Sequence, residues 1–95
     1  MNVFEFSGKV THIADESRES GHGITVTHYP ESVNDGYADI GFVIPIDLWL
    51  KSDIRMYDAI ELKGHFIKVI ANGDVRRAKL LHIVDEIVSI SHEGE

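Results

Sequence analysis

The side chains best suited to bind a ligand are five cations gathered in one stretch of the chain, residues 63–79. This stretch carries a net charge of +4, with Asp74 as its single acidic residue, whereas the rest of the chain carries −11. Cations lining a groove bind the phosphates of a nucleic acid. Four of these cations are the candidate phosphate contacts: Lys68, Arg76, Arg77 and Lys79. The alternative is that they form a solvated strand edge that discourages aggregation.

Flat side chains and hydroxyl groups that could contact nucleobases occur on the second and third expected strands. Tyr29 and Tyr37 flank a turn-like segment, and a base stacked on an aromatic ring contributes about 1–3 kcal/mol. Thr25 and Thr27 alternate with apolar residues, which predicts that their hydroxyl groups face outward beside the tyrosines. The alternative for Tyr29 and Tyr37 is that they cover the turn between them.

Metal binding and catalysis find little support. The six histidines are scattered without the close pair that zinc sites usually show, so we expect no metal and no cofactor. The absence of cysteine excludes a thiolate nucleophile, and no Gly-x-Ser-x-Gly elbow is present. We therefore expect a binding protein and not an enzyme. His12, His28 and His82 fall on the inward phase of their expected strands.

The elements that would position these groups are mainly strands. Period-2 alternation of apolar residues is typical of half-buried strands, and it recurs along most of the chain. Strands are predicted over 3–13, 24–29, 37–44, 59–70 and about 75–90, and a short helix is predicted over 46–54 after Pro45. The segment 14–23 is polar and is expected to be a loop, and Asn72-Gly73-Asp74 is a strong hairpin signal.

Five strands with one helix between the third and the fourth predict an all-β fold with one short helix, a five-stranded OB-fold-like Greek-key barrel. Gly8 and Gly64 lie inside strands, where a small barrel needs sharp bends. Trp49 and Leu50 of the helix are expected to plug one end. The alternatives are another small five-stranded barrel or an α+β sheet with one helix.

Length and charge limit the organisation and the partners. The 95 residues are expected to form a single domain over 1–90 with a frayed tail over 91–95. The apolar stretches are far shorter than the roughly 20 residues of a membrane span, and no signal peptide is visible. We therefore expect a cytoplasmic protein without membrane contact. The net charge of −7 argues against a strongly basic nucleic-acid binder.

The residues also carry a resemblance to a known family. MNVFEFSGKVTHIADE is similar to the first strand of bacterial single-stranded DNA-binding proteins, through the order Gly8-Lys9-Val10-Thr11. FVIPIDLWLKSDIRMYDAIELKGHF resembles the third strand, helix and fourth strand of that family, and LLHIVDEIVSI resembles its closing strand with an acidic pair. A shorter relative, a primosomal replication protein with the same barrel, is an equally good comparison. The resemblance implies the OB-fold and single-stranded DNA as partner.

Two hypotheses follow for the function. The first is a non-catalytic protein that binds single-stranded nucleic acid, accessory to DNA replication or to a mobile element. The alternative is an OB-type protein–protein interaction module whose acidic faces contact a basic partner. In either case we expect a homo-oligomer, most simply a dimer, because both faces of the last strand are apolar and a small barrel cannot bury both.

Overall fold

The computed structural model of the chain describes residues 3–28, 38–70, 73 and 78–92. Within these ranges the elements are β1 (Val3–Ile13), β2 (His22–His28), β3 (Ala38–Ile44), α1 (Ile46–Lys51), β4 (Ala59–Ile70) and β5 (Ala78–Ser91). The strands predicted over 3–13 and 59–70 have the predicted bounds. No helix in the described part of the chain has the length and apolar character needed to cross a membrane.

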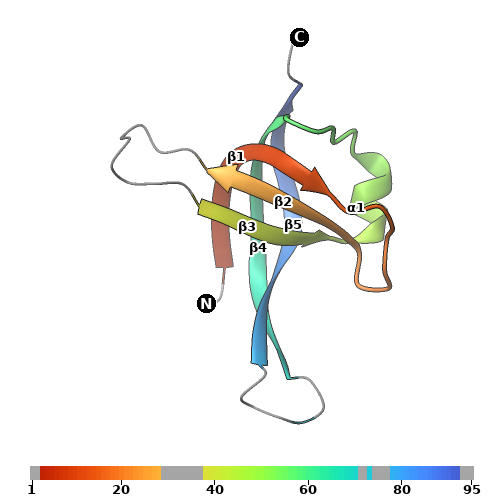
Figure 1. Cartoon of the computed structure of the whole chain (residues 1–95), viewed down its shortest axis with the longest axis vertical. Helices are drawn as coiled ribbons and strands as arrows, with labels where there is room; N and C mark the ends of the chain where they lie inside the picture. Colours follow the sequence, from red (N-terminus) through yellow and green to blue (C-terminus); the bar gives the residue numbers. More distant parts are fainter. Residues whose placement is uncertain (1–2, 29–37, 71–72, 74–77, 93–95) are drawn as a thin grey trace.

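The strands close into a barrel in the order β1-β2-β3-β5-β4, with β4 pairing back onto β1 (Figure 1). The contacts between neighbouring strands are antiparallel, except that β3 and β5 run parallel and pair through Phe42–His82 and Val43–Ile83. This topology confirms the predicted five-stranded, OB-fold-like barrel with one short helix.

Strand β1 belongs to both halves of the barrel because it bends in its middle. Lys9 pairs with Ala59 of β4 and also with Thr27 of β2. Directly before it, a Cβ on Gly8 would overlap the carbonyl of Thr27. Glycine at this position therefore lets two strands approach closely enough to close the barrel, in agreement with the bend expected there.

The barrel interior is filled by the inward residues of all five strands. Apart from Ile54, which follows the helix, the fully buried apolar residues lie on strands and are Val10, Ile24, Val26, Phe42, Ile44, Ile60, Leu62 and Val84. At roughly 25 cal/mol per Å² of apolar surface, burial of these side chains is the main stabilising contribution. On β2 and β4 the buried residues recur at every second position, Ile24 and Val26 on β2 and Ile60 and Leu62 on β4, as expected for half-buried strands.

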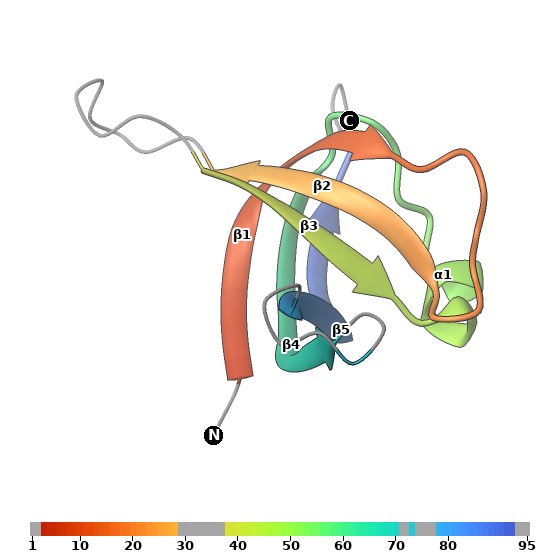
Figure 2. The same cartoon turned by 60° about the horizontal axis from the view of Figure 1, so that its bottom comes forward.

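Helix α1 covers one end of the barrel, but not with the predicted pair of residues (Figure 2). Leu48 and Trp49 pack against the core, whereas Leu50 is 76% exposed, so the expectation for Leu50 is wrong. The helix also ends at Lys51 instead of residue 54, because Ser52 is extended and its hydroxyl donates to the carbonyl of Trp49 at 2.8 Å.

A buried histidine that the loop prediction over 14–23 did not anticipate fastens this end. His22 opens β2, and its ring stacks on Trp49 with centroids 4.0 Å apart and an interplanar angle of 5°. Its Nε2 donates to the carbonyl of Ala14 at 2.8 Å, and the hydroxyl of Ser17 lies 2.6 Å from Nδ1. The β1–β2 loop is thereby tied to the helix.

The expected frayed tail is partly ordered. Strand β5 continues to Ser91, and Nδ1 of His92 donates to the buried carboxylate of Asp58 at 2.9 Å. The same carboxylate accepts the backbone N–H of Arg55 at 2.7 Å, within a turn where Tyr57 has a φ of 69°. Residues 93–95 of the predicted tail lie outside the described residues.

We predict that His22→Ala lowers the free energy of unfolding by about 1–3 kcal/mol, because the buried carbonyl of Ala14 loses its donor. Trp49 would also lose its stacking partner. Urea denaturation followed by the fluorescence of Trp49 measures the change. The matched control is His12→Ala, which removes an exposed ring and should shift the free energy by no more than about 0.5 kcal/mol. Equal effects of the two substitutions would contradict the role given to His22.

Candidate nucleic-acid interface

The end of the barrel opposite α1 is open and is lined by aromatic side chains. The start of β1 lies there, with Phe4 paired to Gly64 of β4, whereas α1 follows the end of β3 (Figure 2). Five rings form this end, which we call the mouth: Phe4, Phe6, Phe42, Phe66 and His82. All four phenylalanines of the chain are therefore gathered in one place.

The rings of the mouth contact one another in tilted and edge-on geometry. Phe4 is central, with its centroid 5.3 Å from that of Phe42 and 5.5 Å from that of Phe66. His82 lies edge-on to these rings, 4.8 Å from Phe66. Such tilted arrangements are the preferred ones for aromatic pairs. They leave Phe4, Phe6 and Phe66 half-buried, with part of each ring open to solvent.

A hollow of about 220 Å³ opens between these rings. The rings of Phe4, Phe6 and Phe66 line it together with Ile40, Phe42, His82 and Glu5, which is the charged residue among the described lining residues. Exposed His28 adds a further flat ring at its edge, 6.0 Å from Phe6, and its Nδ1 donates to the carbonyl of Ser7 at 3.1 Å. A flat apolar group such as a nucleobase could stack here.

Burial among the phenylalanines changes the acid–base behaviour of His82. Its pKa is lowered from the ordinary 6.5 because the surrounding rings remove water that would stabilise the charged form. His82 is thus the inward histidine that the strand phase predicted. His12 and His28 are exposed instead. For His12 the cause is a register shift between Val10 and His12, which turns the following residues over.

The arm, residues 66–70 of β4 and 78–82 of β5, extends beyond the barrel from this end (Figure 1). The register pairs Phe66 with His82 and Lys68 with Leu80, so these four residues share the inner face that continues the barrel interior. Lys79 pairs with Val69 one position further and lies on the outer face. Lys68 is therefore the candidate cation on the same face as the mouth, and Lys79 is not.

The two threonines of the predicted site are separated from the mouth as well. Thr27 is buried; its hydroxyl donates to Asp39 and lies 2.8 Å from that of Thr11, so it is engaged inside the protein. Thr25 lines a hollow of about 310 Å³ on the outer side of the barrel, beside Gly23 and Gly41. The remaining predicted site residues, Tyr29, Tyr37, Arg76 and Arg77, lie outside the described residues.

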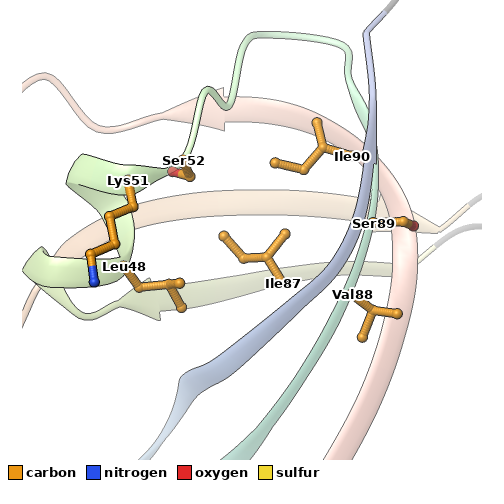
Figure 3. Close-up of a pocket in the computed structure, with 7 residues that line it drawn as sticks. All are labelled: Leu48, Lys51, Ser52, Ile87, Val88, Ser89 and Ile90. Atoms are coloured by element: carbon orange, nitrogen blue, oxygen red, sulfur yellow. The ribbon is translucent and has the colours of Figure 1, made fainter.

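A further hollow of about 370 Å³ lies at the opposite end, between α1 and β5 (Figure 3). Leu48 faces Ile87 across it, and Lys51 is its one charged lining residue. Apart from Lys51, its walls are aliphatic side chains and serines. Without a flat ring this hollow offers nothing on which a base could stack. The described residues also contain no group of three or more ligating side chains able to hold a metal ion.

Sequence reasoning missed the mouth because period-2 alternation assigns inward residues to the core. Phe4, Phe6 and Phe66 do point inward, but they lie where the barrel is open: Phe4 and Phe6 near the start of β1, and Phe66 where the arm leaves the barrel. One signal in the sequence could have found the site: Phe4 and Phe6 lie at the start of the first strand, and Phe66 lies in the second half of the fourth. Antiparallel pairing of these two strands brings the three residues to the same end of the barrel. Comparison with family models, with curated proteins and with solved structures found no match.

We predict that the free energy of unfolding falls as the pH drops below about 6.5 and that His82→Phe reduces this loss. Folding lowers the pKa of His82, so below pH 6.5 the unfolded chain binds a proton at this residue more readily than the folded chain does. The bound proton therefore stabilises the unfolded state. Above pH 6.5 His82 is neutral in both states, so its contribution to the free energy of unfolding no longer changes with pH. Urea denaturation at pH 8 and pH 5.5 measures the difference.

The control for this series is His12→Gln, which changes an exposed histidine that does not line the hollow of the mouth. It should leave the pH dependence of the wild type in place. If His82→Phe and His12→Gln lose stability equally between the two pH values, the burial of His82 does not contribute to the pH dependence of the free energy of unfolding.

Proposed function

We propose that the protein binds single-stranded nucleic acid, preferably DNA, across the mouth and the inner face of the arm. The observation that carries this proposal is the combination of half-exposed aromatic rings with Lys68 on one continuous face. Single-strand binding without sequence preference uses these two parts: flat rings on which bases stack, and cations that follow the backbone.

The distribution of charge favours the mouth and the arm over the helix end as the place where a nucleic acid binds. The β1–β2 loop and α1 together carry four exposed carboxylates against the two cations Arg18 and Lys51; the carboxylates are Asp15, Glu16, Glu19 and Asp47. The sequence between β4 and β5 instead adds Arg76 and Arg77 to the cations of the arm. A polyanion is repelled from the helix end and attracted to the arm, although the net charge is −7.

The segment between β2 and β3 adds two aromatic residues that suit the proposed binding of bases. Tyr29 directly follows His28, whose ring contacts Phe6 of the mouth, and Tyr37 precedes by three positions Ile40, which lines the hollow there. Such a protein acts stoichiometrically in the cytoplasm, without turnover, as an accessory of DNA replication or of a mobile element. We take it to work as a homo-oligomer.

We predict that Lys68→Ala weakens binding of a labelled oligo-dT and lowers the slope of log K against log salt by about 0.7, the value for one phosphate contact to a single strand. The double substitution Arg76→Ala with Arg77→Ala should flatten the slope further. Phe66→Leu removes a stacking surface while keeping an apolar side chain, so it should weaken binding and leave the slope unchanged. Fluorescence titrations at several salt concentrations separate these effects.

The matched control is Lys51→Ala, which removes an exposed lysine at the helix end. It should change neither the affinity nor the slope. Lys51→Ala and Lys68→Ala acting alike would overturn the assignment of the mouth. Failure of the wild type to bind at low salt would reject nucleic-acid binding and favour the protein–protein interaction module, the other candidate function.

A further inference from the structure

The outer side of β3, β5 and β4 carries an unusual number of aliphatic side chains. Where one face of an antiparallel sheet packs on the core, the other normally is polar. Here five outward residues on these three adjacent strands are aliphatic: Val43, Ile67, Val69, Leu81 and Ile83. We call this surface the outer aliphatic face.

The register shows that these residues form one continuous surface. Val43 pairs with Ile83 across the β3–β5 contact, and Ile67 pairs with Leu81 across the β4–β5 contact. Ile67 is 40% and Val69 41% exposed, and Leu81 and Ile83 are only half-buried. A contiguous exposed apolar surface on a small protein marks an interaction site.

The charges at the two ends of this face are opposite in sign and evenly spaced. Along the outer side of β5 the order is Lys79, Leu81, Ile83 and Asp85. Asp85 lies on this side as well, because its carboxylate accepts from Nδ1 of His65, the residue paired with Ile83, at 2.8 Å. Lys79 and Asp85 lie the same number of residues before and after His82.

We propose that a second copy of this chain packs on the outer aliphatic face about a two-fold axis near His82. An isologous interface must be self-complementary, so each residue meets the symmetry-related position of the other copy. An antiparallel arrangement of the two β5 strands places Leu81 against Ile83 of the partner subunit. The same arrangement places Lys79 against Asp85 of the partner subunit, and symmetry repeats that contact.

This pairing fits a second copy better than an unrelated partner, because the outer residues of β5 run from a cation to an anion. Turned about a two-fold axis, the same residues therefore present opposite charges and aliphatic side chains to one another. The central residues are aliphatic on both copies, and the charged residues fall at the rim, as is usual for interfaces between proteins. The mouth and Lys68 lie on the opposite face of the arm and remain uncovered. Dimerisation and nucleic-acid binding can therefore fail separately.

A charge-swap series tests the interface by sedimentation equilibrium over a range of protein concentrations. The wild type should show a reversible monomer–dimer equilibrium. Lys79→Asp places two like-charged contacts in the dimer, and so does Asp85→Lys, so each should raise the dimer dissociation constant about tenfold or more. Lys51→Asp, with the same charge change at the helix end, should leave the constant unchanged.

Mixing the two variants provides the decisive measurement. Lys79→Asp and Asp85→Lys chains complement each other at both rim contacts, so an equal mixture should dimerise where neither variant does alone. The double variant Lys79→Asp with Asp85→Lys should dimerise as the wild type does. A wild type that stays monomeric, single variants that dimerise unchanged, or a mixture that stays monomeric would each overturn the proposed interface. Circular dichroism of each variant confirms that the barrel is folded.

Discussion

Closure of the barrel depends on β1 pairing with two different strands. Lys9 is the residue at which the pairing changes from β4 to β2, and Gly8 supplies the close approach to Thr27 that the change requires. If β1 did not bend there, it could pair fully with only one neighbour, and the other would keep a free edge. The core, the mouth and the arm all exist because this one strand joins both halves.

The two ends of the closed barrel differ in how their polar and aromatic groups are used. At the helix end, His22 stacks on Trp49 and satisfies the carbonyl of Ala14, so the rings there are fastened and internal. At the mouth no helix of the described part of the chain covers the rings, and Phe4 and Phe66 keep part of their surface in solvent. Aromatic residues are thus covered at one end and partly exposed to solvent at the other.

The arm gives each of its faces a different chemistry because successive strand residues point to opposite sides. Lys68 and Leu80 continue the interior of the barrel, while Ile67 and Leu81 continue its outer surface. Beyond the barrel neither face is covered by the rest of the described chain. Our two proposals therefore place the polyanion on one face of this hairpin and the second subunit on the other.

Much of the fold follows from local pattern. The alternation over 3–13 and 59–70 determines two strands with their bounds, and Pro45 marks the start of the helix because it ends β3 and cannot donate to the sheet. The basic character of the β4–β5 connection is likewise a property of the sequence alone. These features could be predicted because they depend on neighbours a few residues apart.

Other features were decided only by tertiary structure. His12 turns outward because a register shift in β1 interrupts the alternation, and no local pattern announces such a shift. Leu50 points to solvent because the helix turns Leu48 and Trp49 toward the core instead. The gathering of Phe4, Phe42 and Phe66 requires three strands that closure alone brings together, since which ends of a barrel stay open depends on long-range pairing and not on sequence period.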